Sequence, residues 1–192
     1  MTEPELINLL RNSDPMACRI LVDRYGGLVF NTALGLLQHH SDAEDMAQEV
    51  FAYAFQRVGE FRGDAKLSTW LYRITLSKSL DFLKAKKRNK RSGFLQSIFG
   101  PEGAGLAVDK PHFQHPGVLL ERQEQAQILF WAIDKLPEQQ KTAFVLHKLE
   151  DQSYAEIAEI MQVSLSSVES LMFRARQNLK THLGKWYAGE GR

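Results

Sequence analysis

The sequence contains a single cysteine and no long hydrophobic run, and each shortage excludes a class of protein. The single cysteine, Cys18, leaves no disulfide possible within the 192-residue chain, as is typical of a reducing compartment. Because no run of about 18 apolar residues occurs, we expect no membrane-spanning helix. The opening residues MTEPELINLL also lack the cationic start of a signal peptide. Apolar residues make up 44% of the chain, enough for packed cores, which excludes global disorder.

The alternation of apolar and polar residues that marks a half-buried strand is also absent, and helical periodicity fills both halves of the chain. Between the halves, residues 93–117 hold five of the 13 glycines and three of the six prolines, a composition that disfavours a helix or a central strand. We therefore predict an all-α fold of two small helical domains, residues 1–92 and 118–192, joined by a flexible linker at 93–117. The linker has one apolar island, which is either a docking helical turn or an unstructured patch: Phe94, Leu95, Ile98 and Phe99.

The net charge of +1 argues against a protein that simply coats nucleic acid, but the charges are unevenly distributed. Residues 1–60 hold four basic and nine acidic side chains (4 − 9 = −5), whereas residues 61–92 hold ten basic and two acidic ones (10 − 2 = +8). Residues 171–185 hold four cations and no acidic side chain. Solvated helix faces would give the same counts. Two basic blocks on separate helices nevertheless indicate two contacts with a polyanion.

An acidic helix is predicted in SDAEDMAQEVFAYAFQRV, which starts at residue 41. Ser41 is a natural N-cap, and carboxylates crowd the first turn, where the helix dipole favours anions. The apolar positions of this helix are expected to face the core. Its other face is either a solvated surface or a patch aimed at a basic partner, and it carries, at spacings of three and four, Asp45, Gln48 and Glu49.

The next segment, FRGDAKLSTWLYRITLSKSLDFLKAKKRNKR, begins with a turn and continues as a helix from about Ser68, with a buried stripe at Leu67, Leu71 and Ile74. An aromatic ring that stacks on a base, beside cations that hold phosphates, is a common way to bind single-stranded nucleic acid. The same spacing is equally compatible with a Trp70 side chain that is buried in the core and binds no base. The basic end KAKKRNKR either follows phosphates or is simply solvated. The mixed aromatic and cationic face consists of Lys66, Trp70, Arg73 and Ser77.

The stretch SYAEIAEIMQVSLSSVESLMFRARQNLK has the pattern of a helix-turn-helix motif. Ile157 and Met161 supply the apolar side of the first helix, and Val168 and Leu171 anchor the second, which a serine at 164 or 166 can cap. Gln162 stands where glycine often provides a left-handed turn, and a non-glycine residue there costs about 1 kcal/mol.

The second helix of this motif exposes polar side chains that suit DNA. Serines bond phosphates or bases, a glutamate can accept from cytosine N4, and an arginine can bind guanine or phosphate. The alternative is a helix-turn-helix that only packs within the protein and does not bind DNA. The candidates are Ser166, Ser167, Glu169, Ser170, Phe173 and Arg174.

Taken together, DAEDMAQEVF, FRGDAKLSTWLYRI, LPEQQKTAFVLHKLEDQSYAEIAEIM and SSVESLMFRARQNLK resemble the extracytoplasmic-function group of bacterial sigma factors. The resemblance covers about residues 15–90 and 120–183. It implies a reversible subunit of RNA polymerase with no enzymatic activity and no cofactor. The first domain would be sigma region 2, which binds the polymerase clamp helices and opens the minus-ten element. The second would be sigma region 4, which reads the minus-thirty-five element as duplex, while the linker would thread through the polymerase near the RNA path.

The resemblance also assigns roles to single positions. Asp45, Gln48 and Glu49 match the clamp-binding motif. The stretch from Phe61 to Ser68 matches the loop that captures a flipped non-template base. The helix beside that loop is matched by Thr69, Trp70, Arg73 and Ser77. The recognition helix is matched by Ser170, Phe173, Arg174 and Arg176. Relatives often carry a basic residue at the position of Glu169, so the promoter sequence does not follow from the resemblance.

Two other classes of protein are weighed against this interpretation. A dimeric helix-turn-helix repressor would need a two-fold interface and palindromic half-sites, and the first domain contains no recognisable ligand site. An enzyme is disfavoured because the six histidines are scattered and no Ser-His-Asp or metal cluster is recognisable. His112 and His115 could pair on a metal, but their place in a linker rich in glycine and proline disfavours this. The expected partners are core RNA polymerase, promoter DNA and an anti-sigma factor. We expect a cytoplasmic protein with no membrane contact of its own, held at the inner face of the membrane only if its anti-sigma factor is.

Overall fold

Eight α-helices and one short 3-10 helix make up the described part of the chain, in which no strand occurs. The structure, a computed structural model, describes residues 1–99 and 120–189, and side chains within 1–89 and 125–189. The prediction of an all-α fold is confirmed. The helices are α1 (Glu3–Arg11), α2 (Pro15–Leu37), α3 (His40–Arg57), η1 (Val58–Glu60), α4 (Leu67–Phe99), α5 (Leu120–Asp134), α6 (Glu138–Lys148), α7 (Tyr154–Met161) and α8 (Leu165–Tyr187).

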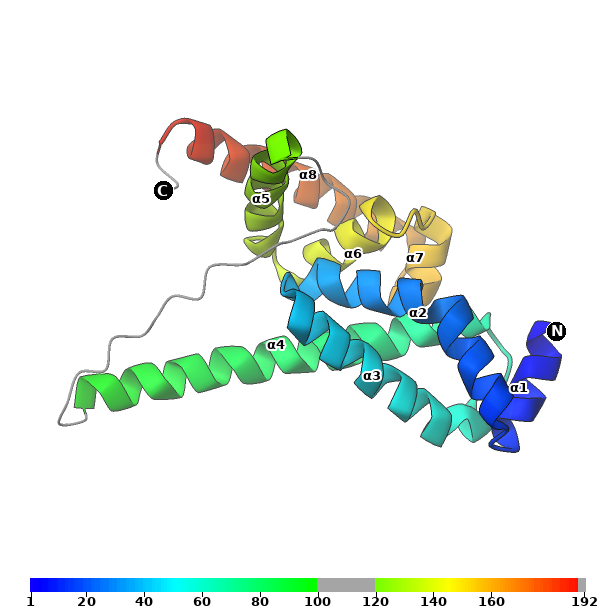
Figure 1. Ribbon diagram of the computed structural model, residues 1–192. Coiled ribbons are helices and arrows are strands. Elements are labelled where there is room, and N and C mark those ends of the chain that lie inside the picture. Colours follow the sequence, from blue (N-terminus) through cyan, green and yellow to red (C-terminus); the bar gives the residue numbers. More distant parts are fainter. Residues whose placement is uncertain (100–119, 190–192) are drawn as a thin grey trace.

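Helix α2 is the centre of the first helix group, α1 to α4, and packs against the other three (Figure 1). By length and composition alone it could cross a membrane, contrary to the expectation from the sequence. However, Leu21, Val29 and Leu36 of α2 are at most 1% exposed within the protein core. Burial of such apolar surface against neighbouring helices is the ordinary reason for a helix of this composition.

Helix α3 begins two residues earlier than the sequence predicted, and Ser41 is not its N-cap. The cap is His39, whose Nδ1 accepts a hydrogen bond of 3.3 Å from the Asp42 N–H. Helix α2 ends at Leu37, and its C-cap Gln38 is left-handed (φ 57°), so the chain turns sharply and enters α3 at once. Ser41 therefore lies inside the first turn, where its side chain is exposed.

Helix α4 is 33 residues long and projects beyond the rest of the molecule (Figure 1). It runs through Gly93 to Phe99, so the first seven residues of the predicted linker are helical. A single glycine costs a helix only about 1 kcal/mol, and residues 94–99 contain neither glycine nor proline. The breaking pair Gly100–Pro101 comes only after the helix has ended. The remainder of the predicted linker, 100–117, lies outside the described residues.

The second helix group, α5 to α8, packs on the first, and the two groups share one continuous core. Helix α6 lies against α2, and α7 lies against α4 (Figure 1). At Gly35 the fit is tight, because a Cβ there would lie 2.7 Å from Val145 Cγ1 and 2.9 Å from Leu149 Cδ1. The sequence predicted two domains joined only by a linker, and did not reveal this packing.

Candidate nucleic-acid and protein interfaces

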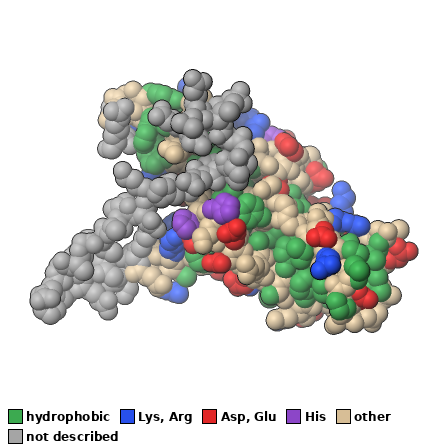
Figure 2. All heavy atoms as spheres, viewed as in Figure 1, with side chains coloured by type: hydrophobic (Ala, Val, Ile, Leu, Met, Phe, Trp, Pro, Cys, Tyr) green, Lys and Arg blue, Asp and Glu red, His purple; other side chains and the backbone are tan. Residues whose placement is uncertain are grey.

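The acidic face of α3 consists of Asp45, Gln48 and Glu49, all of which are exposed. They face outward because Met46 and Val50, on the opposite side of the helix, are at most 3% exposed in the core. Acidic side chains gather over the first half of α3 (Figure 2). Glu49 accepts a hydrogen bond from Lys78 of α4 at 2.7 Å, so one member of the face already has a basic partner within the chain.

The loop between η1 and α4, residues 61–66, leads into the predicted single-strand surface. The buried stripe predicted at Leu67, Leu71 and Ile74 is confirmed, with each side chain at most 7% exposed. Phe61 and Thr69 are each only 5% exposed, so neither presents its side chain to solvent in this structure.

Trp70 is half-buried: it packs against the core, and its ring centroid lies 5.3 Å from that of Phe61. Trp70 therefore combines the two alternatives left open by the sequence, since part of the ring is core and part is accessible. Among the other predicted residues, Ser68 is half-buried, and Lys66 and Ser77 are exposed.

The same surface of α4 contacts the second helix group. Arg73 donates from Nη2 to the Glu159 carbonyl oxygen of α7 at 2.8 Å. Lys66 lies 3.7 Å from the Glu156 carboxylate of the same helix. Two of the predicted DNA-contacting cations thus already have partners on α7.

A buried polar network lies beside these contacts, and the sequence did not reveal it. The Tyr72 hydroxyl donates to Glu150 Oε2 at 3.1 Å, and Gln152 Nε2 donates to the Tyr72 oxygen at 3.2 Å. Burial, above all, raises the pKa of Glu150 to about 7; the Tyr72 hydrogen bond opposes this shift and the charge of Asp151 adds to it. Burial, with Glu150 beside it, likewise raises the pKa of Tyr72. Burial therefore favours the neutral form of both groups where the two helix groups meet.

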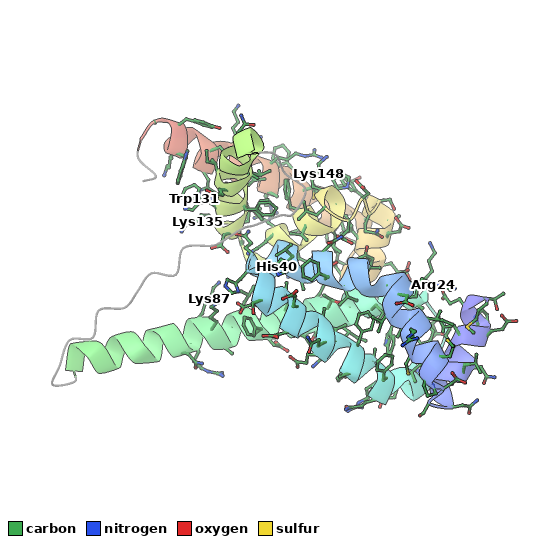
Figure 3. The ribbon with its side chains drawn as sticks, viewed as in Figure 1. Arg24, His40, Lys87, Trp131, Lys135 and Lys148 are labelled. Carbon is green, nitrogen blue, oxygen red and sulfur yellow. The ribbon has the colours of Figure 1, made fainter. Side chains whose placement is uncertain are left out.

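The basic end of α4 is also partly neutralised within the chain. Lys86 Nζ lies 3.0 Å from the Asp42 carboxylate of α3, and Lys84 Nζ lies 3.6 Å from Glu138 of α6. Lys87 projects from α4 near the start of α3, where His40 lies (Figure 3). Exposed ion pairs such as these contribute about 0–1 kcal/mol each, so a phosphate can displace the carboxylates.

The helix-turn-helix motif predicted from the sequence is present in α7 and α8. Ser153 and Glu156 form a capping box at the start of α7. The turn follows at Gln162, which is left-handed (φ 57°) as predicted, and the Val163 N–H closes it by donating to the Ala158 carbonyl at 3.0 Å. Of the two candidate serines, Ser164 is the cap of α8, accepting from the Ser167 N–H.

One side of α8 anchors the motif, with Val168, Met172 and Ala175 fully buried. The opposite side is open to solvent; Phe173 is 63% exposed, a large value for an aromatic ring. Arg176 is exposed but donates to the Tyr154 hydroxyl at 2.9 Å, which ties α8 to α7. Ser167 is half-buried and bonded to Ser164. The remaining predicted side chains are all exposed: Ser166, Glu169, Ser170 and Arg174.

Helices α5 and α8 are joined by aromatic side chains. The ring centroids of Trp131 and Trp186 lie 4.9 Å apart, and Lys135 lies over the Trp131 ring at 5.7 Å (Figure 3). Lys141 of α6 is almost fully buried and bonds Asp134 at 2.9 Å; burial lowers the pKa of Lys141, whereas the Asp134 carboxylate acts in the opposite direction.

Among the described residues no group of three His, Cys, Asp or Glu side chains could hold a metal ion. His112 and His115 lie outside the described residues.

Comparison with known proteins gives consistent matches for both helix groups. Residues 21–89 match the family model for sigma-70 region 2, and residues 127–179 match that for sigma-70 region 4. The RNA polymerase sigma-E factor of the extracytoplasmic-function group from Haemophilus influenzae is 32% identical over 193 residues, covering 95% of this chain and 96% of that protein. Its counterpart from Escherichia coli K12 is 32% identical over 179 residues, covering 92% of each chain.

Two solved structures have a similar fold. CnrH, in complex with the cytosolic domain of CnrY, superposes with a TM-score of 0.66 at 21% identity, covering 95% of this chain and 97% of CnrH. The sigma factor RpoE from Bartonella quintana, in complex with the anti-sigma factor NepR, superposes with a TM-score of 0.54 at 22% identity, covering 82% of this chain and 90% of RpoE.

Proposed function

Since the chain belongs to the extracytoplasmic-function group of sigma-70 factors, we propose that it is an alternative sigma factor. In this role it binds core RNA polymerase, directs the enzyme to specific promoters and opens the DNA. Members of this family are initiation factors and not catalytic enzymes, and we extend this to the present chain, which would act without any enzymatic activity of its own.

The observation that carries the proposal is the pairing of two surfaces on the two matched regions. Region 2 presents the acidic face of α3, and region 4 presents the solvent-exposed side of α8 on a helix-turn-helix scaffold. A helix of this kind enters the major groove with its exposed side toward the base edges. A factor with one protein-binding and one DNA-binding surface can bring the polymerase to a chosen sequence.

We assign three groups of residues within this function. Asp45, Gln48 and Glu49 contact the clamp helices of core polymerase. The minus-thirty-five element is contacted by Ser166, Ser167, Glu169, Ser170, Phe173, Arg174 and Arg176. The minus-ten element is bound by Phe61, Lys66, Ser68, Thr69, Trp70, Arg73 and Ser77. Within this last group the burial of Phe61 and Thr69 supports an indirect role, in which they hold the accessible edge of Trp70 and the cations in place.

The chain is also proposed to be controlled by an anti-sigma factor. The Bartonella quintana relative of similar fold was solved bound to one. Such a partner would act in the cytoplasm, where the polymerase is, and would hold this protein at the inner face of the membrane only if it were itself anchored there.

In vitro transcription tests the proposal. Purified protein mixed with core polymerase should produce discrete transcripts from a pool of genomic fragments, whereas core polymerase alone should not. Size-exclusion chromatography provides the second measurement, since a sigma factor co-elutes with the core enzyme. A dimeric repressor would instead elute apart from the polymerase and bind palindromic DNA by itself, and that result would overturn the assignment.

A further inference from the structure

Helix α8 continues beyond residue 179, where the match to region 4 ends, and none of the assignments above includes its last part, residues 180–187. We propose that this end of α8 is a second DNA-binding surface, which uses Lys180 to hold the backbone phosphates beside the minus-thirty-five element, whatever the base sequence there. The inference rests on the proposed function and goes beyond it, because the residues assigned to that element end at Arg176.

The proposed surface continues the side of α8 that is assigned to reading bases. Each residue turns an α-helix by about 100°, so residues three, four or seven positions apart share one side. Exposed residues along the whole of α8 lie within about 40° of a single line. They are called the α8 stripe and are Ser166, Ser170, Phe173, Gln177, Lys180 and Gly184. The first three are already assigned to the minus-thirty-five element, and the last three extend the same side along the helix.

The opposite side of this end of α8 is fixed to the second helix group. Asn178 Nδ2 donates to Gln140 Oε1 of α6 at 2.8 Å. The ring centroids of His182 and Trp186 lie 6.5 Å and 4.9 Å from that of Trp131 on α5, which α8 passes on its way to the C-terminus (Figure 1). Because these contacts hold the side away from the α8 stripe, the stripe faces solvent.

Lys180 brings a positive charge to a surface that lacks acidic side chains. It is exposed, and it forms no ion pair within the part of the chain whose side chains are described. Lys66 and Lys86, by contrast, each have a carboxylate partner. After Glu169 the sequence contains no acidic residue until Glu190. A cationic surface without internal carboxylates attracts a polyanion.

A shallow hollow runs along this half of α8, and the described residues that line it are Gln177, Lys180, Thr181, Gly184, Lys185 and Ala188. Gly184 leaves the helix surface open, because a Cβ there would meet no atom within 4 Å outside its own stretch of helix. The Thr181 hydroxyl donates to the Gln177 carbonyl oxygen at 3.1 Å. The Gln177 amide and the Lys180 ammonium are therefore the donors that this surface offers, and both kinds of group bind phosphate oxygens.

The length of α8 brings its far end to the DNA backbone and not to the bases. Its 23 residues span about 34 Å, whereas the major groove is about 12 Å wide. A recognition helix places its N-terminal residues against the base edges. Lys180 follows Phe173 by seven positions (180 − 173), or about 10 Å, so it meets the phosphates that border the groove. A lysine binds phosphate as a point charge and carries no base preference there.

The first test uses the holoenzyme, assembled from the full-length protein and core polymerase, and a duplex promoter that the wild-type holoenzyme binds. Lys180→Ala should weaken binding in a gel shift and reduce the slope of log affinity against log salt concentration by about 0.9, the value for one phosphate contact. The defect should therefore shrink about threefold between 50 and 200 mM salt. Lys185→Ala removes the same charge about 100° round the helix from the centre of the α8 stripe. It is the matched control and should keep the wild-type slope.

Gly184 allows the charge of the α8 stripe to be changed in both directions. Gly184→Lys should raise the affinity for the promoter and steepen its salt dependence, whereas Gly184→Glu should lower both. The fold should tolerate both changes, because the position is exposed, open and helical, and lysine and glutamate are better helix formers than glycine. Gly27→Lys and Gly27→Glu make the same changes at an exposed, open glycine of α2 and should bind DNA as the wild-type protein does.

Promoters with one neutral methylphosphonate linkage, moved in turn along the backbone beside the minus-thirty-five element, locate the contact. At the bound phosphate the wild-type protein should lose its advantage over Lys180→Ala, and a change of base pair at that position should leave the advantage intact. An equal defect of Lys180→Ala on every methylphosphonate template, or wild-type affinity and slope in both Gly184 variants, would overturn the inference.

Loss of co-elution of Lys180→Ala with core polymerase would also overturn the inference, because the partner of this surface would then be an acidic protein face. In each of these cases Arg174→Ala should still weaken promoter binding, so the sigma assignment would stand. If the wild-type protein neither binds core polymerase nor directs it to any promoter, the proposed function fails, and this inference fails with it.

Discussion

The hydroxyl of Tyr72 in α4 donates a 3.1 Å hydrogen bond to the Glu150 carboxyl group, which follows α6, and so joins the two helix groups through a buried polar contact. Next to it, Arg73 and Lys66 are engaged with α7. Two of the residues proposed to meet the minus-ten element therefore also contact region 4, so DNA and α7 would share these two cations.

Removal of the Tyr72 hydroxyl should loosen this junction. We expect Tyr72→Phe to lower the free energy of unfolding by about 1 kcal/mol, the net value of a buried hydrogen bond. A double-mutant cycle with Glu150→Ala, measured by urea denaturation, should give a coupling energy of at least about 0.5 kcal/mol. Strictly additive effects would mean that the two side chains contribute independently.

The junction should also respond to pH through Glu150. Its pKa of about 7, raised chiefly by burial, lies above the value of about 4.3 in an unfolded chain. Between these values the folded protein binds the proton more tightly, so this group's stabilisation is full at low pH and is lost as pH rises toward 7. In Glu150→Gln this contribution is absent, so the unfolding free energy should fall less between pH 5 and pH 8 than it does in the wild-type protein. Glu159→Gln, a change to an exposed carboxyl group on α7, is the control.

Packing at Gly35 offers a steric test of the same contact. A methyl group there would overlap Val145 and Leu149 of the second helix group, so Gly35→Ala should cost about 1–3 kcal/mol through overpacking. Gly27→Ala lies on the same helix, with no atom within 4 Å of the added carbon. It should stabilise the protein by up to about 1 kcal/mol, since alanine is the better helix former. Thermal denaturation of the two variants measures the contrast, and equal shifts would contradict the close approach of α2 and α6.

Reversal of charge on α3 tests the proposed polymerase contact. Asp45→Lys combined with Glu49→Lys should abolish co-elution with core polymerase, because both side chains are exposed on the proposed binding face. The circular dichroism signal should be unchanged, since neither residue packs in the core. Glu44→Lys alters an exposed carboxylate beside this face and should retain binding. Undiminished core affinity of the double variant would remove α3 from the interface.

The two proposed DNA contacts should fail at different steps. Arg174→Ala should weaken closed-complex formation in a gel shift by about 1–3 kcal/mol if the arginine makes a bidentate base contact, and a promoter with a pre-melted minus-ten region should restore part of the loss. Trp70→Ala should bind duplex normally and open it slowly, as seen by permanganate reactivity. Lys185→Ala, near the far end of α8, controls for loss of charge. Failure of both variants at the binding step would contradict the division of labour.

Much of this fold could be read from local patterns. The stripe at Leu67, Leu71 and Ile74 and the left-handed turn at Gln162 follow from spacing and turn chemistry alone, and both are present. The cap of α3 was missed because a histidine nitrogen replaced the commoner serine oxygen. The end of α4 was missed because the glycines and prolines of residues 93–117 were counted together, although residues 94–99 contain neither.

The junction between the helix groups could not have been predicted in the same way. Tyr72 and Glu150 are 78 positions apart, and neither belongs to a motif that indicates a partner. Arg11 and Phe61 are likewise distant in the chain, and the acceptor is a backbone carbonyl, which no side-chain pattern encodes. Contacts of this kind depend on how complete helices pack, and sequence periodicity describes one helix at a time.

Because α4 is unbroken, side chains along it keep a fixed angular position relative to one another as well as a fixed distance. Each residue advances an α-helix by 1.5 Å and turns it by about 100°. Trp70 and Lys84 are 14 residues apart (84 − 70), which corresponds to about 21 Å and nearly four whole turns, so a single straight stripe passes through both and includes Ser77. Insertion or deletion of one residue between them would leave the 61–66 loop untouched and rotate every cation beyond the change by about 100°. We therefore expect the proposed DNA binding to depend on the number of residues between Trp70 and Lys84 as well as on which side chains occupy the positions between them.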